Sequence, residues 1–339
     1  MAAWAGTGGS LALAAKSLAS ACAPAPAAGA LRAICEALQR TSYLELWAVG
    51  LDLLGEARLL ELVRGSRKLI VPLAGGEVVA WYDGRDDFID SVVREQLSDV
   101  YSFGSRCGGA PQGAWIVDVG GHVGLAALHA RSRAPPGTRV LTVEPSPWNY
   151  FLLRLNVLEN GADGAIEVLH AGVGSVARRW VRGTHFLRSS WMSRAGPGAD
   201  SRDGLVASFN FSEVTLPELF GRFGVSRVAM LKLDCEGCEW HAARQLLHQD
   251  PARPALLGLV DSVAGEVHLA CQHTPFWLPV FVLEKCFPRA WPPEMLRSVW
   301  RLLCGGWRME GACMHERNAT LRAWLGIARL RRSQLGKPL

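Results

Sequence analysis

Charged residues and glycines follow three strand-like runs of the sequence, at positions where they could bind one ligand together. The run "WIVDV" leads into the turn "GGHVG", "RVLTVE" ends at Glu144, and "VAMLKLD" leads into "CEGCE". A glycine turn that opens a helix presents backbone N–H groups to an anion, whereas carboxylates accept protons or hydrogen bonds from hydroxyl groups. This combination is typical of a site that binds a small polar ligand and moves a proton beside it.

The glycine turn at 120–124 limits the kind of ligand. A dinucleotide site requires Gly-x-Gly-x-x-Gly, so that the backbone can approach a pyrophosphate, but His122 occupies the place of the second glycine. A side chain there, together with Asp118, would crowd and repel a pyrophosphate. The same features suit a ligand end with an ammonium for Asp118 and a carboxylate for the N–H groups of Gly120, Gly121 and the helix start. The amino-acid end of S-adenosylmethionine is such a group.

Glu144 supports this cofactor, because it ends the strand that follows the turn, twenty residues beyond Gly124. In doubly wound folds an acid at this place accepts hydrogen bonds from ribose hydroxyls. A glycine turn alone is equally compatible with a tight turn of purely structural importance. The predicted cofactor-binding residues are Asp118, Gly120, Gly121, His122, Gly124 and Glu144.

The acidic segment "KLDCEGCE" supplies candidates for the chemistry itself. Methyl transfer from a sulfonium is an in-line displacement, in which the enzyme aligns the nucleophile and accepts its proton. Asp234 and Glu236 are the candidate base or orienting carboxylate, and His268 is an alternative base. Lys232 lies on the same side of its strand as Asp234 and could orient that carboxylate. Alternatively, Lys232 and Glu239 form ion pairs that only fix the strand-helix turn.

The elements that position these residues alternate from residue 115 onward. Strand-like runs at 115–119, 139–145 and 228–234 are each followed by a segment of helical pattern. Such alternation predicts a doubly wound, mostly parallel, Rossmann-like α/β sheet with helices on both faces. Ligands bind such sheets at the carboxyl ends of the strands, so the three charged segments converge on one rim.

The segment before this sheet predicts an N-terminal extension. Residues 1–30 are rich in Ala, Ser, Gly and Pro and lack acids, which is compatible with a targeting peptide or a disordered segment. Residues 31–105 show helical periodicity and then a hairpin around "AGG". We therefore expect this extension to precede a methyltransferase domain at 106–325, which is followed by a basic tail at 326–339.

The sequence resembles the FkbM-type S-adenosylmethionine-dependent methyltransferases from about residue 85 to about residue 315, and this resemblance implies the class I methyltransferase form of the predicted sheet. The resemblance rests on "VDVGGHVG", "VEPSPWNYFLLRLNVLENG", "VTLPELF" and "LKLDCEGCEWHAARQLL", whose last segment matches the family's K-x-D-x-E-G-x-E signature. Further on, "GEVHL" and "EMLRSVWRLLCGGWRMEG" are similar to later family elements. The sequence departs from the family at His122, where asparagine is common, and in the longer, Arg- and Gly-rich stretch at 172–212.

The sequence indicates the chemical class of the methyl acceptor and not its identity. Enzymes that methylate amino groups of bases carry an Asn/Asp-Pro-Pro-aromatic loop after the fourth strand, and this chain has an acidic loop without proline there. That difference and the resemblance favour O-methylation of a small-molecule or glycan acceptor, such as a sugar, a polyketide or a similar metabolite. The alternative is a methyltransferase-like domain without turnover, which serves as a binding or scaffold module.

Length and composition predict a folded, soluble protein. The chain has 339 residues, of which 49% are hydrophobic and 20% charged, and this suffices for a large core. No apolar run is long enough for a membrane span. The excess of basic residues, a formal charge of +5, is scattered apart from the tail, so no nucleic-acid partner is expected. An intracellular location is favoured, with organelle targeting as an alternative, and the oligomeric state is not predicted.

Nine cysteines are spread from Cys22 to Cys313 and lack the dense framework of a small secreted protein, so most are expected to be reduced and buried. A rival interpretation assigns Cys235, Cys238, His268 and Cys271 to a zinc site. The absence of a second C-x-x-C motif disfavours it, and no metal is predicted. A redox role for the C-x-x-C pair is also disfavoured, because the strand before it belongs to the methyltransferase pattern.

Overall fold

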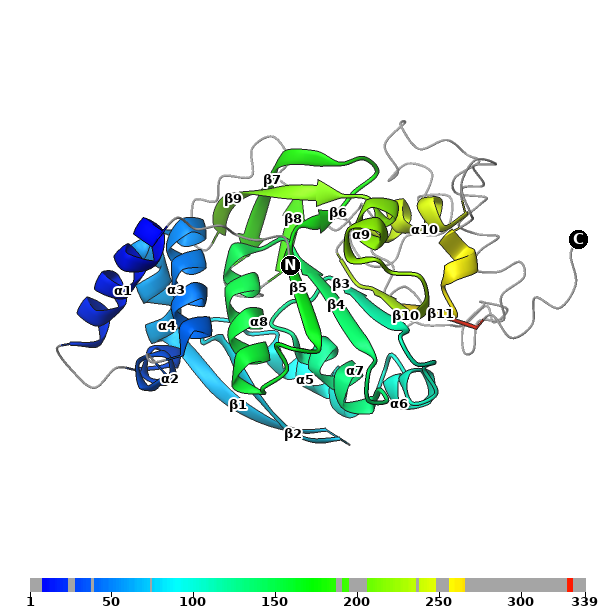
Figure 1. Cartoon of the computed structure of the whole chain (residues 1–339), viewed down its shortest axis with the longest axis horizontal. Helices are drawn as coiled ribbons and strands as arrows, with labels where there is room; N and C mark the ends of the chain where they lie inside the picture. The colour runs from blue at the N-terminus through cyan, green and yellow to red at the C-terminus, as the bar shows by residue number, and fades with distance from the viewer. Residues whose placement is uncertain are drawn as a thin grey trace, which may run out of the picture.

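The central element of the fold is a six-stranded sheet with the strand order β12-β11-β10-β3-β4-β5. In this computed structural model, the described residues are 8–23, 28–37, 40–73, 75–186, 191–194, 206–235, 238–247, 256–265 and 328–331. Neighbouring strands from β11 to β5 run parallel, and β12 joins the edge antiparallel. The predicted doubly wound α/β fold is therefore confirmed (Figure 1).

The strands of the sheet are apolar because both of its faces are covered. The strands are β3 (Trp115–Val119), β4 (Arg139–Glu144), β5 (Ile166–His170), β10 (Val228–Leu233), β11 (Ser262–Gly265) and β12 (Ala328–Arg331). Along β3, Ile116 faces a core that it shares with α7 (Leu125–Arg133) and α8 (Pro147–Glu159). Val117 faces the opposite core, with α9 (Leu216–Phe223) and α10 (Glu239–Leu247). Burial on both faces explains the near-continuous hydrophobic runs.

The N-terminal extension contributes to the same core as the sheet. It contains α1 (Gly8–Cys22), α2 (Ala30–Glu36), α3 (Thr41–Leu54), α4 (Glu56–Gly65), α5 (Ile89–Leu97) and α6 (Phe103–Cys107). Leu18 of α1 and Trp47 of α3 are fully buried in the cluster that also holds Phe151 of α8. Within the predicted low-complexity segment at 1–30, Gly8–Cys22 thus form a helix that packs against α3 and buries Ala14 and Leu18.

The predicted hairpin is formed by β1 (Ser66–Leu73) and β2 (Gly76–Asp83), which pair antiparallel. Asn156 of α8 and Asn160, which caps the C-terminus of α8, cover the free edge of β2. Asn156 accepts a hydrogen bond from Trp81 N and donates to Trp81 O, and Asn160 bonds the N–H and C=O of Val79 in the same way. These bonds satisfy backbone groups that an edge strand leaves unpaired and connect the extension to α8, which packs on the main sheet.

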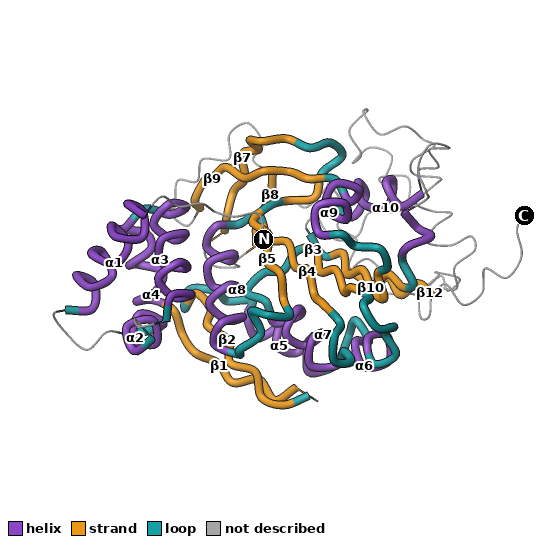
Figure 2. Tube along the Cα trace, in the orientation of Figure 1, coloured by secondary structure: helices purple, strands orange, loops and turns teal. Residues whose placement is uncertain are grey.

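The described parts of residues 172–214 form a second sheet, the inserted sheet, near the rim of the first (Figures 1 and 2). Its strands are β6 (Gly172–Val173), β7 (Arg178–Phe186), β8 (Trp191–Arg194) and β9 (Val206–Val214), in the order β6-β9-β7-β8. Phe209 of β9 packs edge-on against Trp148 at the start of α8, with ring centroids 5.9 Å apart. The inserted sheet is therefore anchored beside the loop that follows β4.

The cysteines differ from the sequence-based expectation. Disulfides join Cys22 to Cys35 and Cys235 to Cys238, whereas Cys107 is free and buried. The expectation of mostly reduced cysteines is therefore wrong for four of the five that the structure describes, because their backbones bring these pairs within disulfide distance. The remaining cysteines, including Cys271, lie outside the described residues.

The C-terminal tail contributes one strand, β12, to the sheet edge. Its backbone pairs antiparallel with β11, in the register Ser262 opposite Arg331. The short 3-10 helix at Leu256–Leu259 precedes β11. Among the helices that the structure describes, none has both the length and the apolar character needed to cross a bilayer.

Candidate functional site

The candidate site lies where the strand order of the main sheet reverses. Chain order proceeds from β3 to β4 and β5 on one side, and β10 then pairs with the other side of β3. Crevices for ligands form at such switch points, outside the carboxyl ends of the strands. Asp118 on β3 and Lys232 on β10 are register partners close to this end. The structure thus brings the glycine turn and the acidic loop together, as predicted.

Asp118 and Lys232 form a buried ion pair. Lys232 Nζ lies 2.9 Å from Asp118 Oδ1, and the two side chains are only 3% and 2% exposed. Thr142 donates a further hydrogen bond of 3.0 Å to Asp118 Oδ2. Contrary to the expectation, Asp118 does not present a free carboxylate to a ligand ammonium, because a protein cation already neutralises it. Removing one partner of such a pair leaves an uncompensated buried charge, so both residues are important for the fold of the rim.

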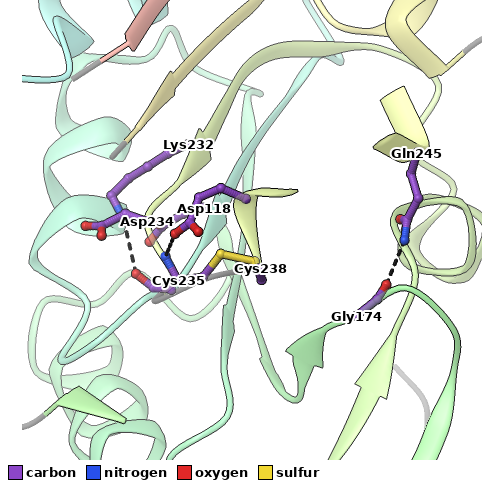
Figure 3. The surroundings of a disulfide bond; sticks show 9 residues. Asp118, Gly174, Lys232, Asp234, Cys235, Cys238 and Gln245 are labelled. Atoms are coloured by element: carbon purple, nitrogen blue, oxygen red, sulfur yellow. Dashed lines mark hydrogen bonds and ion pairs between the residues drawn. A yellow bond between two sulfur atoms is a disulfide. The ribbon is translucent and has the colours of Figure 1, made fainter. Parts of the chain in front are cut away.

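Asp234 lies at the exposed end of the same charge network (Figure 3). Its Oδ2 is 3.5 Å from Lys232 Nζ, and the side chain is 25% exposed. Tyr101 donates a hydrogen bond of 2.9 Å from its hydroxyl to the same oxygen, and the Lys232 ammonium lies 5.2 Å from the centre of its ring. Asp234 therefore combines fixed partners with access to solvent, which a general base requires.

Tyr101 is a residue of the site that sequence reasoning missed. It precedes α6, in the N-terminal extension, and no family motif includes it. Its segment, "DVYSFG", contains no motif that would indicate a partner in the loop after β10. The signal that could have been used is a buried tyrosine, because a buried hydroxyl needs a hydrogen-bond partner.

The glycines of the turn serve close packing. Gly120 has φ +85°, and a Cβ on it would overlap the carbonyl oxygen of Asp234. A Cβ on Gly121 would overlap Thr142 Oγ1. The N–H groups of both glycines donate 3.0 Å hydrogen bonds to Val143 O, so the prediction that they bind a ligand carboxylate is not met in this arrangement. Gly124, at φ +91°, is the N-cap of α7.

Glu144 ends β4, and its carboxylate is hydrogen-bonded to the backbone of the glycine turn. Its Oε2 accepts a 2.8 Å hydrogen bond from His122 N, and its Oε1 accepts one from Ser146 N. Burial raises the pKa of Glu144 to about 7, although these hydrogen bonds and the charge of His122 favour the ionised form. A buried carboxylate with remaining acceptor capacity suits two neighbouring hydroxyl groups such as those of a ribose.

His122 turns its side chain toward the extension. It adopts a left-handed φ of 49°, and its Nε2 lies 3.5 Å from Asp86 Oδ2. Burial lowers the pKa of His122, but the hydrogen bond and charge of Asp86 outweigh that effect and raise it.

His185 of the inserted sheet also lies near the turn. It stacks on Trp148 at 5.0 Å, and its Nδ1 is 2.9 Å from Ser146 Oγ. Burial lowers the pKa of His185 to about 3, so it is neutral.

Two of the predicted catalytic residues, Glu236 and His268, lie outside the described residues. Glu239 lies at the start of α10, where its Oε1 accepts a 2.8 Å hydrogen bond from Cys235 N, in line with the structural alternative. In the part of the chain that the structure describes, no cluster of His, Cys, Asp and Glu could hold a metal ion. Cys235 and Cys238 are bonded to each other, which removes two of the four ligands of the rival zinc site.

Comparison with known proteins identifies a methyltransferase segment in this chain. Residues 118–250 match the methyltransferase FkbM domain, which confirms the family inferred from the motifs for this segment. A curated relative, the methyltransferase sdnD of Sordaria araneosa, is 25% identical over 154 residues, which are 38% of this chain and 59% of that protein. The chain thus spans about three fifths of the relative's length. S-adenosylmethionine is the cofactor of FkbM-type domains, in agreement with the cofactor predicted here.

Three solved structures show remote similarity to this chain. A SAM-dependent methyltransferase from Agrobacterium tumefaciens is 11% identical with a TM-score of 0.36, and the match covers 69% of this chain and 58% of that one. TrmN from Thermus thermophilus is 15% identical with a TM-score of 0.30, over 66% and 46% of the two chains. A SAM-dependent O-methyltransferase from Thermotoga maritima is 12% identical with a TM-score of 0.30, over 73% and 66%.

The residues of the rim fit S-adenosylmethionine on two observations. Glu144 is a buried carboxylate at the end of β4, where a ribose would need acceptors. Nε2 of His185 is buried without a hydrogen-bond partner among the residues described, beside the same loop. An orphaned buried nitrogen of this kind calls for a ligand group or water.

Proposed function

We propose that the chain is an S-adenosylmethionine-dependent O-methyltransferase that acts on a hydroxyl group of a sugar or another small metabolite. The observation that carries this proposal is the position of Asp234, a partly exposed carboxylate fixed by Tyr101 and Lys232 at the switch point of a methyltransferase fold. A hydroxyl nucleophile requires an acceptor for its proton, and this carboxylate is placed to receive it.

The cofactor supplies an electrophilic methyl group on a sulfonium. We assign Glu144 and the backbone of the glycine turn to binding the ribose. We assign His185 and Trp148, which stack on each other beside the loop that follows β4, to the neighbouring part of the cofactor site. Lys232 pairs most closely with the buried Asp118, and Asp234 is the more exposed of its two described carboxylate partners, so we assign Asp234 to act on the acceptor. Tyr101 fixes the orientation of Asp234 and is a positioning residue. Alignment of the acceptor oxygen and removal of its proton are the two tasks of this group.

An oxygen acceptor is favoured over a planar amino group. The loop that follows β10 contains two carboxylates and no proline, whereas recognition of a base amino group uses proline carbonyls and an aromatic ring. The inserted sheet, anchored beside the cofactor loop through Trp148, is the element we assign to acceptor recognition. Its exposed residues include Trp180, which is 78% exposed and could stack on a sugar ring.

Calorimetric titration with S-adenosylmethionine is the first test. The full chain should bind it with 1:1 stoichiometry, and NAD should not compete; tight NAD binding would contradict the assignment.

The second test offers isotope-labelled methyl donor with pools of sugars and hydroxylated metabolites. Transfer of label to an oxygen supports the proposal. Cofactor binding without transfer across a broad screen favours the alternative, a methyltransferase-like scaffold module.

A further inference from the structure

The disulfide between Cys235 and Cys238 occupies the loop that carries the proposed base. Both cysteines stand at the variable positions of the K-x-D-x-E-G-x-E signature, so the methyltransferase pattern does not require them. Cys235 directly follows Asp234, and Cys238 directly precedes α10. Figure 3 shows the sulfur bridge next to Asp118, Lys232 and Asp234. The disulfide is thus a feature of this chain added to a site that the family signature already defines.

The backbone at the disulfide is in direct contact with the cofactor turn. Asp234 N donates a 3.0 Å hydrogen bond to Val119 O, which is the residue before the turn. The Cα of Gly120 lies so close to Asp234 and Cys235 that an added Cβ would overlap the Asp234 carbonyl and come within 3.2 Å of Cys235 Cα. No side chain stands between the two segments. A change in the backbone at Cys235 would therefore alter the packing against the glycine turn.

The other end of the bridge connects to the inserted sheet. Cys238 O accepts the first helical hydrogen bond of α10, from Ala242 N at 3.0 Å, which makes Cys238 the N-cap. Further along α10, Gln245 donates a 2.6 Å hydrogen bond to Gly174 O, next to β6 (Figure 3). The disulfide thus links the cofactor turn at one cysteine to the proposed acceptor-binding side at the other.

We propose that Cys235 and Cys238 form a thiol–disulfide exchange site whose oxidised state holds the cofactor turn in its binding arrangement and whose reduction by a dithiol weakens S-adenosylmethionine binding. This regulation rests on the proposed function. The sequence argument set aside a redox role because the motif lay in a methyltransferase loop. That location couples the redox state of the cysteines to cofactor binding, because the disulfide lies in the segment that packs against Gly120 of the glycine turn.

The exchange step is balanced as follows. A thiolate of the dithiol attacks Sγ of Cys235, which is partly exposed whereas Cys238 is only 9% exposed. A mixed disulfide forms, the Sγ–Sγ bond breaks, and the electron pair leaves on Cys238 Sγ. The N-terminus of α10 favours a thiolate there, although Glu239 in the first turn opposes it. The second thiol of the dithiol then displaces Cys235, so two electrons and two protons pass to the protein and the dithiol becomes a disulfide.

The experiment compares S-adenosylmethionine affinity before and after reduction with dithiothreitol. Differential alkylation and mass spectrometry report which cysteines are reduced in each sample. We expect the dissociation constant of the parent to rise at least about fivefold on reduction of Cys235–Cys238, the lower end of typical coupling between sites. The variant Cys235→Ser/Cys238→Ser should bind with the weaker affinity under both conditions.

The second disulfide provides the matched control. The variant Cys22→Ser/Cys35→Ser removes the bridge between α1 and α2 and should still respond to dithiothreitol as the parent does. If that variant does not fold, a time course of reduction in the parent shows which bridge the affinity follows.

Two outcomes separate the two proposals. Equal affinity of the oxidised and reduced parent would overturn the exchange inference and leave the proposed function intact. Absence of binding in both states would overturn the proposed function and, with it, the coupling.

Discussion

Tyr101 donates its hydroxyl hydrogen bond to Oδ2 of Asp234 over 2.9 Å, across 133 residues of sequence. The bond joins the N-terminal extension to the acidic loop of the methyltransferase segment. Because Tyr101 is 1% exposed, its hydroxyl has little access to water and is held in place by packing. The extension is therefore part of the candidate active site and not only a neighbour of it.

Replacement of Tyr101 by Phe should reduce the rate of methyl transfer without weakening the binding of the cofactor. A hydrogen bond to a charged group contributes about 1.5–3 kcal/mol, so we expect a loss of about tenfold to a hundredfold in kcat. The dissociation constant of S-adenosylmethionine, measured by calorimetry, should remain that of the parent. Tyr43→Phe is the matched control, because this variant also loses a tyrosine-to-carboxylate hydrogen bond, to Glu159, away from the rim. Similar losses of kcat in both variants would exclude a positioning role for Tyr101.

Asp234→Asn should separate binding from turnover. The amide keeps the shape of the side chain but accepts no proton, so methyl transfer should fall by about 10²–10⁴, the usual contribution of a general base. Cofactor affinity should be preserved, and single-turnover kinetics with labelled donor provide the measurement. Full activity of this variant would transfer the role of base to Glu236 or His268, which should then be changed in the same way.

The raised pKa of Glu144 predicts that cofactor affinity depends on pH. The carboxyl group must lose its proton to accept two ribose hydrogen bonds, so the affinity should increase as the pH rises through about 7 and then level off. Calorimetry between pH 6 and 8.5 tests this, and Glu144→Gln should lose the dependence while binding more weakly by about 1.5–3 kcal/mol. His122, whose pKa is also raised, titrates beside it, so an unchanged pH profile in Glu144→Gln would assign the effect to His122.

The same pKa gives the sign of the stability change. The folded pKa of Glu144 lies above the ordinary value of 4.5, so between about 4.5 and 7 the folded protein holds a proton that the unfolded chain has released. The contribution of the protonated Glu144 carboxyl group to the free energy of unfolding is therefore fully present below pH 4.5 and is lost as the pH rises through about 7. Chemical denaturation of Glu144→Gln should show a smaller fall in the free energy of unfolding across this range than the parent does.

Gly120→Ala should destabilise the rim and abolish cofactor binding. The new Cβ would overlap the carbonyl of Asp234, and φ is +85° at this position. Gly137 has the same φ of +85° with no atom within 4 Å of a Cβ, so Gly137→Ala measures the backbone strain alone. We expect Gly120→Ala to lose much more stability in denaturant titrations than Gly137→Ala. Equal losses in the two variants would show that close packing at Gly120 is unimportant.

Lys232→Met should unfold the rim, because Asp118 would keep a buried charge without its cation. Breaking a buried pair in this way costs about 3–5 kcal/mol, whereas removing both charges is often close to neutral. The double variant Asp118→Asn/Lys232→Met should therefore recover most of the free energy of unfolding. If Asp118 acts only through Lys232, the double variant should also bind S-adenosylmethionine. Loss of binding in a well-folded double variant would restore the predicted contact between Asp118 and the ligand ammonium.

The sequence determined the alternation of strands and helices, because burial on both faces of a parallel sheet leaves continuous apolar runs that local pattern shows directly. Charged residues at the ends of these runs, such as Asp118, Glu144 and Asp234, were placed on one rim by the same rule. These are consequences of strand direction and need no knowledge of distant contacts.

Only the tertiary structure decided what those residues contact. The pairing of Asp118 with Lys232 depends on the register of β3 against β10, and the bond from Tyr101 depends on how the extension packs beneath them. The disulfide at Cys235 likewise depends on a loop conformation that brings two sulfurs together. Such contacts either join residues that are far apart in the sequence or depend on the conformation of a loop. Hydrophobic periodicity carries no information about contacts of either kind.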